Sequence, residues 1–162
     1  LRPVSREGLH LTLCFIGNAE VDEIHQAIQS VRLPGFSLTI KGLGRFGHGK
    51  GGVLWAGVEP CEALIDLQQQ LVTVLQQAGI QPDTKRFHPH ITLARVKPRA
   101  SKYKIEHFLQ QSDQFELTPV VFNEFVLVSS ETRPEGSIYH IEYRFPLISN
   151  EQPFAAYPQD KG

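Results

Sequence analysis

The same strand pattern occurs twice in this chain, and the repetition limits what the chain can fold into. One segment reads LHLTLCFIG, and a segment in the second half reads HPHITLARV. Apolar and polar residues alternate in both, as they do in a strand with one buried face. The alternation puts His10 and Thr12 on one side of the first strand, and His90 and Thr92 on one side of the second. The leucines between them are expected in a core.

The elements predicted after each motif follow a similar order. The spacing of apolar residues predicts helices, and alternation predicts further strands. The helices cover 20–31, 62–78 and 105–111, and the strands cover 36–41, 53–59, 120–128 and 138–145. The glycine-rich segment 42–52 predicts a long hairpin loop. This order favours an α+β protein of two similar lobes, with partly antiparallel strands and one motif in each lobe.

Composition excludes several classes of protein. The 162 residues are 41% hydrophobic and 20% charged, enough to bury a core as one domain or as two small lobes. A net charge of −1 gives no general attraction to polyanions, so contact with a nucleic acid requires a local basic patch. Two cysteines form no disulfide framework, and the sequence contains neither a leader pattern nor a long apolar run. We therefore expect a cytoplasmic protein without a membrane partner.

Paired histidines and threonines suit acid and base chemistry on a phosphodiester. Histidine has an unperturbed pKa of about 6.5, so one imidazole can be neutral while another is protonated. Such a pair supplies a general base and a general acid. Threonine hydroxyls on the same face can bind the oxygens of an anion between the imidazoles. A single His-x-Thr in a strand is ordinarily a solvated surface pair, but its recurrence at the start of both halves favours a functional site.

The motifs HLTL at 10–13 and HITL at 90–93 match the paired His-x-Thr signature of the 2H phosphoesterases. More narrowly, LHLTLCFIG and FHPHITLAR resemble the RNA 2′,3′-cyclic phosphodiesterases, also called LigT-like 2′-5′ RNA ligases. The resemblance extends from about residue 2 to about residue 145, and it includes GFSLTI, VLWAGV and FVLVSS.

This resemblance implies a bilobal LigT-like fold of two pseudo-symmetric lobes, with mainly antiparallel sheet, helices outside and a central cleft. Residues 1–149 would form this single domain, and 150–162 would form a loose polar tail. Relatives begin with a strand and a helix before the first motif, so we expect such a segment to precede Leu1.

The resemblance also implies an activity and the residues that carry it. Members open the 2′,3′-cyclic phosphate at an RNA 3′ end to leave a 2′-phosphate, without a metal or cofactor, and some reversibly join tRNA halves through a 2′-5′ linkage. By motif, His10 would be the proton donor and His90 the proton acceptor, although alternation alone leaves either order open. Thr12 and Thr92 would bind the phosphate. RNA ends are the expected partners, and a monomer is the default state.

Two further residues match positions of substrate contact in the family. Arg95 closes the second motif, where a basic residue can approach the phosphate, and Phe15 follows the first, where a ring can stack on the terminal base. Strict alternation puts Arg95 on the face of Leu93, so its role requires a bulge or bend in the strand. Phe15 lies two residues after Leu13, so alternation puts both side chains on the same face. A core position for Phe15 is therefore an equal alternative.

Other interpretations compete with this one. His10, His88 and His90 invite a zinc site, but neither motif has a thiolate or carboxylate beside it. Lys50 in the glycine-rich segment precedes Gly51, where a triphosphate-binding loop needs serine or threonine. A module that binds a nucleotide or RNA end without cleaving it is the main alternative to an enzyme. The presence of both histidines and both threonines favours the enzyme.

Overall fold

The structure, a computed structural model, describes residues 1–48 and 51–148, which form two compact units. Unit 1 consists of residues 1–13, 38–60 and 85–120. Unit 2 consists of residues 14–37, residues 61–84 and the chain from 121 onward. Neither unit is a contiguous half of the sequence, because the chain passes between them several times. Lys50 and the tail 150–162 lie outside the described residues.

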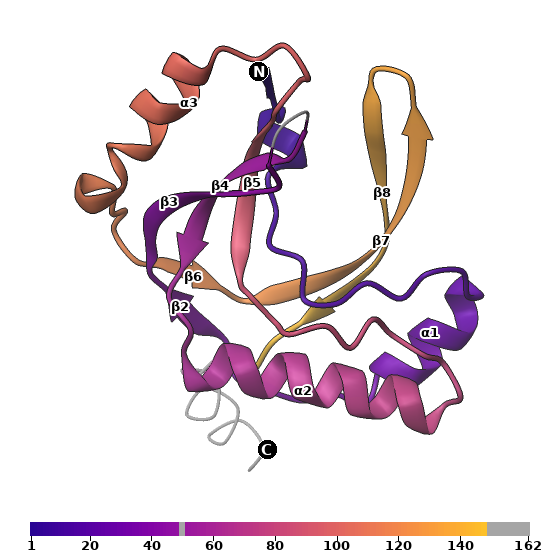
Figure 1. Ribbon diagram of the computed structural model, residues 1–162. Helices are drawn as coiled ribbons and strands as arrows, with labels where there is room; N and C mark the ends of the chain where they lie inside the picture. The colour runs from indigo at the N-terminus through magenta and orange to yellow at the C-terminus, as the bar shows by residue number, and fades with distance from the viewer. Residues whose placement is uncertain (49–50, 149–162) are drawn as a thin grey trace. The chain divides into compact units, whose positions relative to one another are not determined.

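Unit 1 is built on an antiparallel sheet of four strands, which Figure 1 shows together with a helix of the same unit. The strand order is β1 (Arg2–Pro3), β5 (His90–Arg95), β4 (Val53–Val58) and β3 (Ile40–Phe46). A 3-10 turn η1 (Arg6–Gly8) follows β1. The helix α3 (Lys102–Leu109) and the 3-10 turn η2 (Ser112–Gln114) follow β5.

One face of this sheet forms the core of unit 1. Leu54 of β4 and Ala94 of β5 are direct partners in the ladder, so their side chains share a face. Both are buried together with Val96 and with Ile105 of α3. The Ser101 hydroxyl accepts a hydrogen bond from a backbone amide of the first turn and caps α3. The helix therefore packs on the Leu54 face of the sheet.

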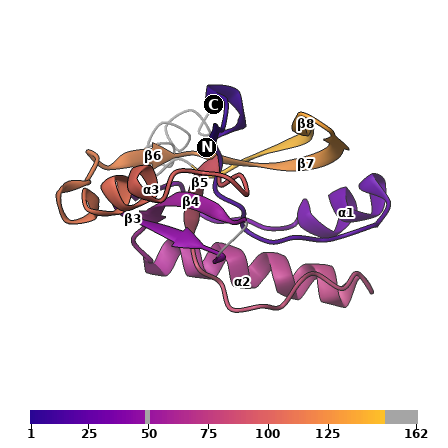
Figure 2. The same cartoon turned by 45° about the horizontal axis from the view of Figure 1, so that its top comes forward.

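The described residues of unit 2 form two helices and a long hairpin (Figure 2). The helix α1 (Val21–Ile28) packs against α2 (Glu62–Gln77), and β7 (Glu124–Arg133) pairs with β8 (Gly136–Pro146). The buried stripe of α2 consists of Leu64, Leu67, Leu71 and Leu75. Gly79, with a φ of 80°, ends this helix in the left-handed conformation that glycine adopts without strain. No described helix is long and apolar enough to cross a membrane.

Tyr143 of β8 attaches the hairpin to α1 within unit 2. Its hydroxyl donates a hydrogen bond to the Asp22 carboxylate over 3.2 Å, and its ring stacks on His25 with centroids 4.0 Å apart. The hydrogen bond to Asp22 raises the pKa of Tyr143, because it is lost when the phenol ionises. A two-stranded sheet of β2 (Phe36–Leu38) and β6 (Val120–Phe122) lies where the chain passes from one unit to the other.

The predicted helices are confirmed, and two of the predicted loops are too long. Residues 42–46, expected in a loop, continue β3 and pair with β4. The turn expected after Val128 is also shorter, since β7 continues to Arg133. Glycine, serine and glutamate are weak strand formers, but hydrogen bonds to an adjacent strand outweigh that local preference in both segments.

We expect Leu54→Ala to lower the free energy of unfolding by about 2–5 kcal/mol, because it opens a cavity where Leu54 packs at 1% exposure against α3. Urea unfolding followed by circular dichroism measures the change. Ile65→Ala on α2 is the control, since Ile65 is 38% exposed and should cost much less. Equal losses for the two variants would contradict the assignment of the core.

Candidate active site

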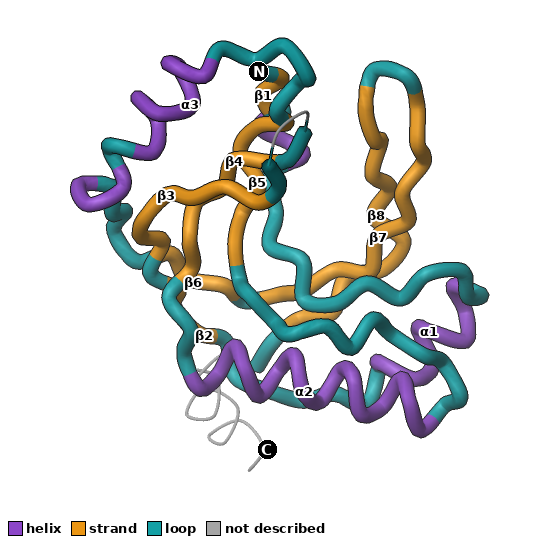
Figure 3. Tube along the Cα trace, viewed as in Figure 1, coloured by secondary structure: helices purple, strands orange, loops and turns teal. Residues whose placement is uncertain are grey.

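The two motifs are neighbours in the sheet of unit 1. Pro3 of β1 pairs with β5, and after the η1 turn the same segment meets β5 again, where Leu11 forms an isolated antiparallel bridge with Ile91. Figure 3 draws the first motif as a loop beside β5. The prediction of a regular strand there is wrong, because η1 inserts residues between β1 and Leu11 and interrupts the ladder.

The Leu11 bridge indicates the alignment of the first motif with β5. Continuing the antiparallel alignment by one residue in each direction places His10 beside Thr92 and Thr12 beside His90. The histidines then occupy diagonal positions, which are roughly 7–8 Å apart in such a pair. This spacing leaves room for one phosphate between the imidazoles. We call the side that carries these four residues the motif face.

Both motifs belong to unit 1, with His10 in its first segment and His90 in its last. The prediction that each lobe supplies one motif is therefore wrong. The physical reason is the Leu11 bridge, which adds the segment before residue 14 to the edge of β5 rather than to the unit that contains α1. The quartet thus belongs to one unit, in which the first motif is bridged to β5 of the second.

A bulge in β5 decides the position of Arg95. At a register shift between β4 and β5, Leu93 has no partner on β4, and the alternation of faces reverses there. Beyond the shift, Arg95 pairs with Val53. On β4, Val53 and Trp55 are two residues apart and therefore point to the same face. Trp55 pairs with Thr92, so Arg95 and Thr92 both lie on the motif face. The bulge that the role of Arg95 requires is therefore present, and its side chain is exposed.

The two catalytic candidates are oriented by the same backbone device. His10 Nδ1 lies 2.6 Å from the carbonyl oxygen of Gly8, and His90 Nδ1 lies 2.7 Å from that of His88. A carbonyl oxygen only accepts hydrogen bonds, so each Nδ1 carries the proton that it donates. Nε2 is then the nitrogen that can take up or release a proton. The matching contacts give both rings the tautomer that acid and base catalysis requires.

Aromatic rings that the motifs alone did not predict surround His90 on the motif face. The ring centroid of Phe46 lies 4.9 Å from that of His90, and the centroid of Trp55 lies 6.2 Å from it. Phe46 and Trp55 also contact each other, and His88 packs edge-on against both. The available signal was the strand VLWAGV, where the alternation puts Trp55 opposite to the buried Leu54 and Ala56.

Gly44 makes room for the Trp55 ring. The two residues are partners in the β3–β4 ladder, and a Cβ at position 44 would overlap the indole. The indole Nε1 is buried and has no hydrogen-bond partner among the described residues. The shape of the surrounding chain, rather than a hydrogen bond, therefore holds Trp55 beside His90.

The near-neutral net charge conceals a strong separation of charge between the units. Unit 1 contains twelve of the sixteen lysines and arginines but only five aspartates and glutamates, a surplus of seven positive charges. Unit 2 contains the other four basic and twelve acidic residues, a surplus of eight negative charges. The local basic character that contact with a nucleic acid requires therefore coincides with the unit that carries the motifs.

The structure also gives the positions of the candidate Phe15 and of Arg45 in the glycine-rich segment, and it bears on the zinc hypothesis. Phe15 belongs to unit 2 and is 68% exposed, so the alternative of a core position is wrong. Arg45 pairs with Leu54 and therefore lies on the face opposite to the motifs, where its guanidinium donates to the Gly51 carbonyl over 3.2 Å. Among residues 1–48 and 51–148, no three histidine, cysteine, aspartate or glutamate side chains converge as metal ligands would.

A comparison with family models decides the membership that these residues suggest. The model of the 2′-5′ RNA ligase superfamily matches residues 2–134. The chain belongs to this superfamily. The expected 2H phosphoesterase relationship is thereby confirmed, and the match contains both histidine motifs and Arg95.

Similar proteins of the superfamily come from bacteria and archaea. An RNA 2′,3′-cyclic phosphodiesterase of Thermotoga maritima is 34% identical over 146 residues, which cover 86% of this chain and 76% of the relative. One of Aeropyrum pernix is 28% identical over 155 residues, covering 93% of this chain and 88% of the relative. Crystal structures of Escherichia coli LigT include one in the apo form and others with 3′-AMP and with phosphate. The apo structure matches with a TM-score of 0.68 at 28% identity, covering 90% of this chain and 80% of LigT, which confirms the LigT-like fold.

We expect Gly44→Ala to displace the indole of Trp55 and to change its fluorescence. Trp55 is the single tryptophan of the chain, so the emission reports on this ring alone. Gly51→Ala is the matched control, because a Cβ there meets nothing within 4 Å. An emission maximum that is unchanged in Gly44→Ala, or shifted equally in both variants, would contradict this packing.

Proposed function

We propose that this chain is an RNA 2′,3′-cyclic phosphodiesterase, which hydrolyses the cyclic phosphate at an RNA 3′ end to a 2′-phosphate. The observation that supports the proposal is the Leu11–Ile91 bridge, because an antiparallel alignment continued from it would bring the two His-x-Thr pairs side by side. The activity named for the relatives supports the choice of substrate. The positive surplus of unit 1 suits a polyanion.

In the proposed reaction, His90 acts as the base and His10 as the acid. Nε2 of His90 takes a proton from a water molecule as the water oxygen attacks phosphorus. The bond from phosphorus to the 3′ oxygen breaks, and Nε2 of His10 supplies the proton that this oxygen needs. The products are a 2′-phosphate and a 3′-hydroxyl, and both imidazoles return to their first protonation state by exchange with solvent.

The other motif residues stabilise the charge on the phosphate. Hydroxyls of Thr12 and Thr92 donate to its non-bridging oxygens from positions beside the histidines. Arg95 offsets the charge that grows as the five-coordinate transition state forms, and its guanidinium can contact two oxygens at once. Phe15 has an exposed ring that suits stacking on a base.

The same ring opening would join RNA ends if a 5′-hydroxyl took the place of water, because the 5′ oxygen would bond to phosphorus as the bond to the 3′ oxygen breaks. This would form a 2′-5′ linkage, and tRNA halves are the substrate class that we propose for it. The second candidate function is a module that binds an RNA end without cleaving it. The open, exposed position of His10 suits either function, so turnover has to be measured.

We expect the parent protein to convert a short RNA with a 2′,3′-cyclic phosphate into the 2′-phosphate in the presence of EDTA. His10→Ala and His90→Ala should each lower kcat by at least about 100-fold, because each removes one proton transfer. Chromatography of the product against 2′- and 3′-phosphate standards measures the reaction. His107→Ala, an exposed change on α3, is the control. Binding without turnover by the parent protein would favour the second candidate.

We expect kcat/KM to pass through a maximum as pH is raised from about 5 to about 9. Activity falls on the acidic side because the base becomes protonated, and on the alkaline side because the acid loses its proton. Rates at constant ionic strength with a cyclic mononucleotide measure the profile. A flat profile over this range would rule out paired acid and base roles.

A further inference from the structure

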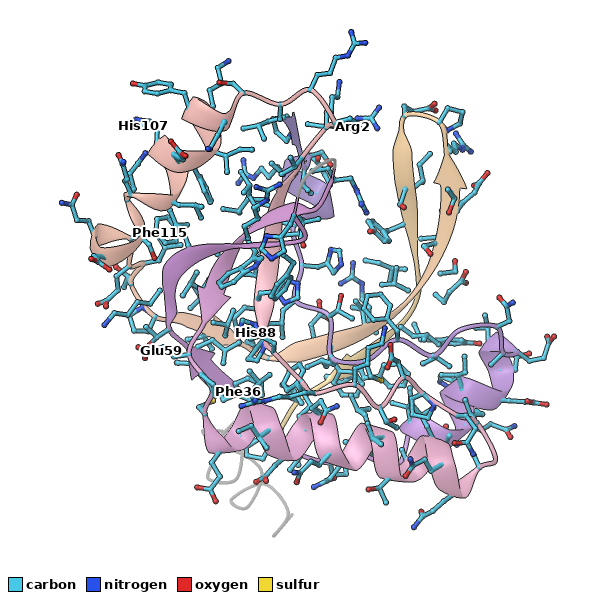
Figure 4. All side chains as sticks on the ribbon, in the orientation of Figure 1. Arg2, Phe36, Glu59, His88, His107 and Phe115 are labelled. Atoms are coloured by element: carbon cyan, nitrogen blue, oxygen red, sulfur yellow. The ribbon has the colours of Figure 1, made fainter. Side chains whose placement is uncertain are left out.

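A second arginine lies directly beside Arg95 on the motif face. Arg2 of β1 and Arg95 of β5 are antiparallel partners, so their side chains emerge on the same side of the sheet. Figure 4 labels Arg2 and His88 near opposite ends of this sheet. Neither arginine makes an ion pair or a side-chain hydrogen bond within the described residues. The sequence motif pointed to Arg95 alone.

Two like charges in direct cross-strand contact destabilise a sheet. Within the described part of the chain, neither arginine forms an ion pair. In the same unit, Glu59 and Glu116 pair with Lys41, and Glu106 pairs with Lys102, while Glu7 and Asp113 form no ion pair with either arginine. A phosphate between or beside the two guanidiniums would relieve the repulsion, because each presents a planar fork of donors that matches phosphate oxygens. The arrangement therefore fits an anionic ligand.

The register gives the position of this arginine pair relative to the motifs. Thr92 and Arg95 lie on the same strand and the same face, separated by the bulge at Leu93. Along a strand of about 3.3 Å per residue, the backbone of Arg95 lies at most roughly 10 Å from that of Thr92, a distance that the long arginine side chain can span toward a phosphate beside Thr92. Arg2 extends the row by one strand, away from β4. A substrate whose cyclic phosphate lies between the histidines would therefore meet Arg2 with its next phosphate.

We propose that Arg2 binds the internucleotide phosphate on the 5′ side of the terminal nucleotide. This inference rests on the proposed function and narrows its substrate class to oligonucleotides that have at least one internal phosphodiester. Arg95 serves the cyclic phosphate, and Arg2 serves the neighbouring one. A mononucleoside cyclic phosphate lacks the second anion and gains nothing from Arg2.

The test compares a dinucleotide that ends in a 2′,3′-cyclic phosphate with the corresponding cyclic mononucleotide. In Arg2→Gln the ratio of their kcat/KM values should fall about tenfold, mainly through KM for the dinucleotide. The dependence of log kcat/KM on log salt should weaken by about 0.7 for the dinucleotide only. Arg2→Lys should recover part of the ratio, because it keeps the charge without the planar fork.

Lys104→Gln is the matched control, since it removes one positive charge of unit 1 from α3, which packs on the other face of the sheet. Its ratio should equal that of the parent. An unchanged ratio in Arg2→Gln, or an equal fall for both substrates, would overturn the proposal.

The experiment also separates this inference from the proposed function. If the parent protein cleaves neither substrate, the proposed function is wrong, and the same comparison is made by calorimetric titration with the two 2′-phosphate products. Arg2→Gln must then weaken binding of the dinucleotide product about tenfold relative to the mononucleotide product. If the ratio of the two product affinities were the same in Arg2→Gln as in the parent protein, the inference would be overturned.

Discussion

Strand β5 is paired on both sides, and these pairings decide which side chains share the motif face. On one side the Leu11–Ile91 bridge attaches the first motif. On the other side β4 contributes Trp55 beside Thr92 and, beyond an extra residue in β5, Val53 beside Arg95. A shift of one residue in either register would turn the histidines or the arginine toward the core. The candidate site is thus a property of register more than of any single contact.

The two faces of this sheet carry different kinds of residue. The bulge in β5 puts Ala94 in the core and the next residue, Arg95, on the motif face. Leu54, Ala94 and Ile105 make the core, and α3 packs on that face. The opposite face carries polar groups whose orientation is fixed, since a backbone carbonyl lies within hydrogen-bond distance of Nδ1 of each histidine. The Trp55 ring on this face packs over Gly44, where a side chain would overlap it. Polar groups attached to a packed sheet lose little freedom when a ligand binds, which suits both binding and catalysis.

The separation of charge between the units adds a second constraint. The basic surplus of unit 1 and the acidic surplus of unit 2 nearly cancel in the whole chain, so a net charge of −1 gives no sign of either. Binding of one terminal phosphate requires only the motif residues. The adjacent arginines of β1 and β5 extend the positive row beyond those residues, and this extension is the basis for assigning the site to an oligonucleotide rather than to a mononucleotide.

The sequence by itself determined the helices, most of the strands, the family and the four motif residues, because these depend on local periodicity and on residue type. It did not determine which strands pair when they lie far apart in the chain. Alternation put Arg95 on the wrong face, since a bulge arises from the alignment of two strands rather than from the residues of one. The assignment of one motif to each lobe failed for the same reason, because the contact of Leu11 with Ile91 joins residues far apart in the chain. Only the tertiary structure could place Phe46 and Trp55 beside His90 and pair Arg2 with Arg95.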